Sequence, residues 1–149
     1  MPKATEALLK DHKMVRKILE GFSVDNPRFS EILLTLHRVL AAHAWFEDEI
    51  FLPALVADPS LNRRFHAEIG QEHQDIDQIL RQLRRAGEKK IQQALALQFR
   101  TLLDTHFAKE ELALFPMGER FLENEGLNRI GAEMQRRQAE VLSQIKVEP

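Results

Sequence analysis

The sequence predicts an all-α fold, an up-down-up-down four-helix bundle with a short additional C-terminal helix. Apolar residues recur at intervals of three and four along nearly the whole chain, which is the period of a helix face. No run alternates apolar and polar residues with the period of a strand, and glycine and proline lie mainly between the periodic segments. A length of 149 residues suits one domain with a sizeable core, so we expect a single domain over residues 1–149.

Capping and breaking residues place the first two helices. The first is expected from about Ala4 to Leu19, with Gly21 ending it. Asn26 is suited to cap the second helix and Pro27 to occupy its first position, because the missing N–H of proline costs nothing there. The second helix then continues toward Leu55.

The same reasoning places the remaining helices. Ser60 is suited to cap the third helix, which is expected to stop near Ala86. The fourth is expected over about 88–123, which completes a bundle over about 4–123. Gly126 then separates it from the short C-terminal helix, over about 127–145.

Two segments repeat one spacing of chemically informative residues. They are His43, Glu47 and Pro53, and His106, Glu110 and Pro116. An acid–His pair precedes each segment, namely Asp11-His12 and Glu72-His73. The order of these residues indicates an internal duplication. Each proline is expected to kink or end its helix one to two turns beyond the glutamate.

The residue types in the repeat are those of metal ligands. Residues four apart lie on one face of a helix, so the His and Glu of each pair can reach one centre. His12 and His73 would complete two half-sites of two histidines and one glutamate each. Imidazole and carboxylate ligands suit iron, manganese or zinc, and the absence of cysteine excludes thiolate sites. A carboxylate has two oxygens, so Glu47 and Glu110 can each bridge two ions.

The phase of each helix places these ligands inside the bundle. All six candidates fall on the apolar stripe of their helix: His12, His43, Glu47, His73, His106 and Glu110. A glutamate buried without compensation costs several kcal/mol or becomes neutral, whereas a bound cation removes that cost. The sequence therefore predicts a metal site in the core of a four-helix bundle.

The doubled motif resembles that of the hemerythrin-like HHE cation-binding domain. The likeness covers about residues 5–123 and includes the Leu52-Pro53 and Phe115-Pro116 pairs after each glutamate. It implies a non-haem di-iron centre, with His12 and His43 on one iron and His73 and His106 on the other. Glu47 and Glu110 would bridge the two ions.

The chain departs from the oxygen-carrying hemerythrins at two places. Those proteins have a further histidine one turn after the third-helix histidine. This chain has Asp77 at that position, and its carboxylate is expected to be able to reach the iron or a water bound to it. They also end on His-x4-Asp, whereas Glu110 and Glu111 both follow His106 here; symmetry with His43 and Glu47 favours Glu110. The motif is closer to the HHE domains of iron–sulfur repair proteins and of iron- or oxygen-responsive regulators. The repair proteins carry a cysteine-containing segment that this chain lacks.

Other conspicuous residues receive structural interpretations. His37 and His66 lie off the ligand positions and are expected to be ordinary hydrogen-bonded histidines. Asp11 and Glu72 point about 100° from the adjacent histidine and are expected at the surface or supporting a ligand. Aromatic residues of the repeats are expected to serve in packing rather than to contact a cofactor: Trp45, Phe46 and Phe107.

The sequence leaves the ligand and the class of function open. We expect the site to bind or react with oxygen, nitric oxide or peroxide, as an enzyme or as a sensing or carrier module. A net charge of −2 gives no general attraction to nucleic acid or to anionic membranes. No apolar stretch is long enough to cross a bilayer and no signal peptide is visible, so cytoplasm is the expected location. A homodimer is compatible with the sequence.

Overall fold

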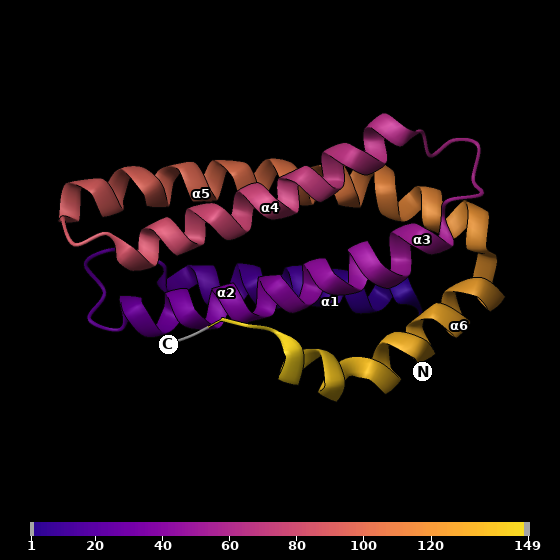
Figure 1. Ribbon diagram of the computed structural model, residues 1–149, viewed down its shortest axis with the longest axis horizontal. Helices are drawn as coiled ribbons and strands as arrows, with labels where there is room; N and C mark the ends of the chain where they lie inside the picture. The colour runs from indigo at the N-terminus through magenta and orange to yellow at the C-terminus, as the bar shows by residue number, and fades with distance from the viewer. Residues whose placement is uncertain (1, 148–149) are drawn as a thin grey trace.

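The computed structural model describes residues 2–147, and four long helices form its bundle (Figure 1). They are α1 (Ala4–Ile18), α2 (Phe29–Phe46), α4 (Arg63–Arg85) and α5 (Lys89–Lys109). Successive helices run in opposite directions, with α1 and α2 on one side and α4 and α5 on the other. No strand occurs within residues 2–147. The predicted all-α, up-down-up-down four-helix bundle is confirmed.

Two short π-helical segments interrupt the helices at the repeated motif. They are η2 (Glu47–Phe51), followed by α3 (Leu52–Ala54), and η3 (Glu110–Leu114), followed by α6 (Phe115–Gln144). In each, the amide that follows the segment donates to the carbonyl of the glutamate five residues earlier. The wider turn places each proline in the first turn of the next α-segment, where it is tolerated. Pro53 is soon followed by the end of its helix, but Pro116 is not, because α6 continues to Gln144.

Two helices begin later than the sequence predicted. Asn26 does not cap α2; its side-chain oxygen accepts a hydrogen bond from the Arg28 amide at 2.9 Å and forms a turn before the helix. The cap of α4 is Asn62, whose side chain accepts from the Phe65 amide at 2.7 Å. Ser60 instead donates its hydroxyl to Asp58. A 3-10 turn, η1 (Leu19–Gly21), ends the first helix near the expected glycine.

The C-terminal helix begins differently from the prediction. Gly126 does not separate two helices; it is buried within α6, and the break lies at Glu123, which has φ 55°. Beyond that break, α6 turns back along the bundle and packs against α1 (Figure 1). The approach is closest at Gly131, where an added Cβ would lie 2.1 Å from the carbonyl oxygen of Pro2.

The core consists of two hydrophobic clusters at different levels of the bundle. Leu8, Ile50 and Ile69 belong to one cluster, and Val15, Leu40 and Ile76 to the other. On each helix the buried His and Glu residues of the repeated motif lie between members of the two clusters. The polar layer is therefore enclosed by apolar side chains on both sides. Among the described residues, no helix combines the length and the apolar character needed to span a membrane.

Candidate metal centre

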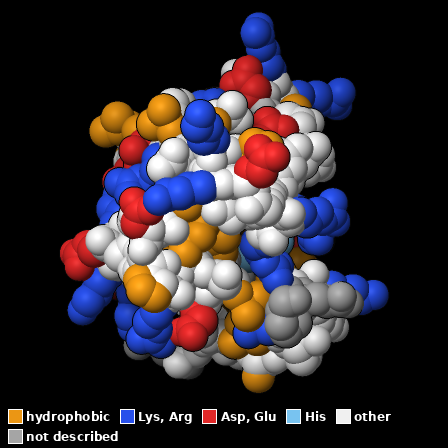
Figure 2. Space-filling view, turned by 90° about the vertical axis from the view of Figure 1, so that its left-hand side faces the viewer, with side chains coloured by type: hydrophobic (Ala, Val, Ile, Leu, Met, Phe, Trp, Pro, Cys, Tyr) orange, Lys and Arg blue, Asp and Glu red, His pale blue; other side chains and the backbone are white. Residues whose placement is uncertain are grey.

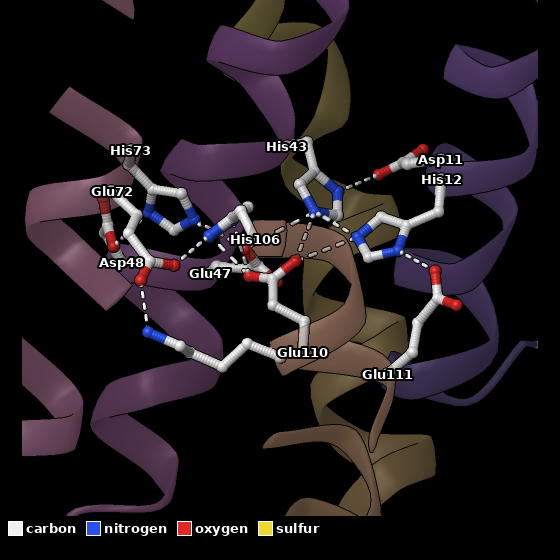
Figure 3. A network of polar contacts seen from close by, with 11 residues as sticks. Asp11, His12, His43, Glu47, Asp48, Glu72, His73, His106, Glu110 and Glu111 are labelled. Atoms are coloured by element: carbon white, nitrogen blue, oxygen red, sulfur yellow. Dashed lines mark hydrogen bonds and ion pairs between the residues drawn. The ribbon is translucent and has the colours of Figure 1, made fainter. Parts of the chain in front are cut away.

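All six candidate ligands converge in the polar layer between the two clusters (Figure 3). The four histidines come from α1, α2, α4 and α5, and each glutamate is the first residue of a π-helical segment. None of the six is more than 8% exposed: His12, His43, Glu47, His73, His106 and Glu110. The geometry therefore brings together every residue that the sequence assigned to the centre.

The ligand atoms form two groups that share both glutamates. One group is made by His12 and His43 with the glutamates, the other by His73 and His106 with the same glutamates; within each group the ligand atoms lie within 4.8 Å of one another. Glu110 faces both groups, because its Oε1 lies 2.9 Å from Nε2 of His12 and its Oε2 lies 3.2 Å from Nε2 of His106. Glu47 is shared through Oε1, at 3.4 Å from Nε2 of His43 and 2.9 Å from Nε2 of His73.

Four carboxylates fix the orientation of the four imidazoles. Each accepts a hydrogen bond at the Nδ1 position of one histidine: Glu111 with His12 at 2.6 Å, Asp11 with His43 at 3.0 Å, Asp48 with His73 at 2.9 Å and Glu72 with His106 at 2.6 Å. Every Nε2 is thereby directed at the centre (Figure 3). This is the arrangement in which outer carboxylates orient metal-binding histidines and make them more basic.

The sequence showed only part of this outer shell. Asp11 and Glu72 were expected at the surface or in support of a ligand, and they do support ligands, but on the neighbouring helix. The role of Asp48 was not foreseen. A signal for it exists, because each glutamate ligand is followed directly by a second acid, Asp48 or Glu111.

Two of the outer carboxylates are themselves paired with cations. Arg16 lies 2.8 Å from Glu111, and Lys109 is paired with Glu72. Each group of ligands thus contains one histidine whose carboxylate partner is a cation-paired glutamate and one whose partner is an aspartate.

The protonation of the metal-free centre follows from the burial of its charges. Burial by itself lowers the pKa of His73. Hydrogen bonds to Asp48 and to the two central glutamates outweigh this effect and raise the pKa to about 11. For His43, burial is likewise outweighed, chiefly by the charge of Glu47, and its pKa is well above 6.5. Burial raises the pKa of Glu110, yet hydrogen bonds with Glu47 and the histidines bring it well below 4.5. Protons on His43 and His73 therefore compensate the buried carboxylates when no cation does.

Three buried atoms at the centre make no well-aligned hydrogen bond, namely Glu47 Oε2, His106 Nε2 and Glu110 Oε2, although the last two lie 3.2 Å apart as an ion pair. Buried polar atoms are rarely left unpaired, because each costs about 1–3 kcal/mol. All three are lone-pair donors that belong to the ligand groups. The donor set therefore fits metal ions, which would satisfy these atoms.

Two residues near the centre lie outside the ligand groups. Asp77, which was expected to reach the metal, instead accepts hydrogen bonds from His37 at 2.6 Å and Arg81 at 2.7 Å. Glu111 is 26% exposed and pairs with His12 and Arg16, so Glu110 is the glutamate shared by the two groups.

The histidines and aromatic residues that were not assigned to the centre have structural surroundings. His37 is buried and hydrogen-bonded, as expected, whereas His66 is half-buried. Phe107 packs in the core with its ring stacked on His12 at a centroid distance of 3.7 Å.

Comparison with known families agrees with this geometry. The model of the hemerythrin HHE cation binding domain matches residues 3–86 and again residues 64–147. The chain belongs to the hemerythrin HHE cation-binding domain family. The second match begins 61 residues after the first, which is also the offset between His12 and His73, so the HHE motif is present twice. The comparisons with curated proteins and with solved structures found no match.

Membership of this family assigns a chemical role to the buried layer. The HHE domain is a cation-binding domain, and the two His/Glu groups are the residues of this chain that could hold a metal ion. The resemblance inferred from the repeated motif is therefore confirmed, together with a His/Glu site for metal ions.

Proposed function

We propose that this HHE domain holds two iron ions and uses them to bind or react with a small molecule, such as oxygen, nitric oxide or peroxide. One ion is held by His12 and His43, the other by His73 and His106, and both glutamates are shared. The observation that carries this proposal is Glu110, because its two oxygens face different histidine pairs. A single ion would use only one of these faces.

The donor set favours iron among the metals that accept imidazole and carboxylate. Each ion would be held by two histidines and by the two shared glutamates, and histidine combined with carboxylate is a donor set typical of non-haem iron. Zinc and manganese accept the same donors, so they are the competing metals. Iron would supply a Lewis acid that can also exchange electrons with a bound small molecule.

The protein contributes orientation and exclusion of water. The outer carboxylates hold each Nε2 toward the centre, and the two hydrophobic clusters separate the centre from solvent along the bundle axis. Carboxylates next to the imidazoles increase their electron donation, which stabilises the higher oxidation state of a bound metal.

The proposal is tested by reconstituting metal-free protein with ferrous iron under anaerobic conditions. We expect about two iron ions per chain, with magnetic coupling between them through the shared carboxylates. Mössbauer and magnetic measurements on the oxidised protein check this result. Saturation at one ion per chain, or two ions without coupling, would contradict the di-iron proposal.

A further inference from the structure

A cavity of about 320 Å³ lies between α2 and α4 and extends to the metal centre. Its wall is mostly apolar and includes Leu40, Ala41, Trp45 and Ile76. Ala41 and Trp45 are both partly exposed, so the cavity has contact with solvent on this side of the bundle. A path into the enclosed polar layer is therefore present at the α2–α4 face.

The cavity meets the two halves of the centre unequally. Both histidines of one group, His73 and His106, line it, whereas only His43 lines it from the other group. His12 is fully buried, and the ring of Phe107, which lines the cavity, stacks against it. Phe115 lies on another side of the His12 ring, with centroids 5.3 Å apart. The half-site with His73 and His106 is consequently the one that faces the open space.

The side chain of Asp77 leaves this space free. Asp77 is one helical turn after His73 and lines the cavity. Its carboxylate does not turn toward the ligands, because His37 and Arg81 hold it. Arg84 contacts Nδ1 of His37 at 3.1 Å, and because arginine only donates, the Nε2–H of His37 points at Asp77. The two helices are thus tied together at this end of the cavity.

The charges of the lining select the kind of molecule that enters. Apart from its histidines, the ionisable side chains among residues 2–147 that line the cavity are the acids Asp48 and Asp77. Both carboxylates are already paired, Asp48 with His73 and Asp77 with His37 and Arg81, so the lining presents no free charge to an ion. Its apolar walls disfavour any ion that must lose its water. Lys and Arg side chains are abundant on the end of the bundle seen in Figure 2, but they do not form the cavity wall. The lining therefore suits a small uncharged molecule.

We propose that the α2–α4 cavity is the entrance for the exogenous ligand of this HHE domain, and that a small uncharged molecule such as nitric oxide or oxygen binds at the ion held by His73 and His106. The proposal rests on the di-iron function proposed above. It adds which ion reacts and by which route the ligand arrives.

The route is tested by changing the width of the cavity. Ala41→Phe is expected to slow nitric oxide binding to the reduced, iron-loaded protein at least 10-fold, and Trp45→Ala is expected to accelerate it. Ala67→Phe, on the exposed surface of α4 and outside the cavity, is the control and is expected to leave the rate unchanged. Stopped-flow rates that are equal in Ala41→Phe, Trp45→Ala and the unaltered protein would overturn the proposed entrance.

A second measurement does not need iron. Xenon binds in apolar cavities, so crystals of metal-free protein under xenon pressure are expected to show xenon between α2 and α4, and Ala41→Phe is expected to remove it. Failure to take up iron would defeat the di-iron proposal alone. Absence of xenon from the cavity would defeat the entrance even in a protein that binds two iron ions.

The choice of ion is tested with two matched substitutions that lie outside the cavity. Glu72 supports His106 and Glu111 supports His12, and each is paired with a cation. With one equivalent of nitric oxide, Glu72→Gln is expected to shift the N–O stretching frequency more than Glu111→Gln does. A shift confined to Glu111→Gln, or equal shifts in both variants, would overturn the assignment to the ion of His73 and His106.

Discussion

Oδ2 of Asp11 lies 3.0 Å from Nδ1 of His43, a ligand on the neighbouring helix, although Asp11 directly precedes a different ligand, His12. The other three outer carboxylates make the same crossing. Each is adjacent in sequence to one ligand and hydrogen-bonds the histidine of another helix: Asp48 with His73, Glu72 with His106 and Glu111 with His12. The four helices of the bundle are thereby linked in a closed ring around the centre.

This ring predicts that the outer carboxylates control metal affinity. Asp11→Ala is expected to weaken metal binding by about 10–100-fold, because His43 loses the partner that orients it. Competition with a chelator measures the change. Asp104→Ala, at an exposed position of α5, is the control and is expected to bind metal like the unaltered protein. Equal affinities of the two variants would contradict the role assigned to Asp11.

The two adjacent glutamates are expected to differ in the size of their effect. Glu110→Ala should lose most of the bound metal, because this fully buried carboxylate belongs to both ligand groups. Glu111→Ala should retain metal with lower affinity, since it removes only the partner of His12. Metal content after gel filtration measures the ranking, and the reverse order would indicate that Glu111 is the shared ligand.

The metal-free protein is expected to lose stability as the pH rises above 6.5. The pKa of His73 is about 11 in the folded protein against 6.5 for an ordinary histidine, so the folded state holds more protons in this interval. The stabilisation is therefore complete below pH 6.5 and decreases as the pH rises toward 11. Urea unfolding of metal-free protein between pH 6 and 9.5 checks this trend.

The iron-loaded protein provides the comparison for that titration. A metal ion replaces the protons on His43 and His73, so the stability of the loaded protein is expected to lack the decline above pH 6.5. Metal binding near pH 7.5 is expected to release protons. A metal-free protein that becomes more stable between pH 6.5 and 9.5 would contradict the assigned protonation.

Exposure to air is expected to oxidise the reduced protein without a long-lived oxygen adduct. The cavity gives solvent access to one side of the centre, and Asp77 stands where the oxygen-carrying hemerythrins have a histidine. Asp77→His is expected to lengthen the lifetime of the adduct by adding a neutral imidazole one turn from His73. Optical spectra recorded after mixing with air measure the lifetimes; a stable adduct in the unaltered protein would contradict the prediction.

Two helical glycines are expected to respond oppositely to alanine. Gly131→Ala should destabilise the fold by about 1–3 kcal/mol, because the new Cβ would lie 2.1 Å from a backbone oxygen of Pro2. Gly70→Ala should stabilise it by about 0.5–1 kcal/mol, since no atom lies within 4 Å of the added Cβ and alanine favours the helix. Thermal unfolding of both variants provides the measurement; a Gly131→Ala protein as stable as Gly70→Ala would contradict the close packing of α6.

Helical periodicity predicted the four-helix bundle, and the spacing of the His and Glu residues predicted which six side chains meet in its buried centre. Both are local properties, because a residue four positions along a helix lies on the same face in any helical protein. The duplication identified Glu47 and Glu110 as equivalent, and both are first residues of a π-helical segment that ends before its proline pair. The sequence did not predict the π-helical turns. A proline indicates that an i to i−4 hydrogen bond of the α-helix is lost, but it does not indicate that the preceding turn widens into a π-helix.

The partners of the ligands were decided only by the tertiary structure. Asp11 and Glu72 point away from their neighbouring histidines, and which side chain they meet depends on how the next helix packs. Asp77 was placed correctly on the face of His73 by its spacing, but its contact with His37 depends on the distance between α2 and α4. A sequence specifies the face on which each side chain lies, whereas contacts across helices are fixed when the apolar clusters on either side of the centre pack together.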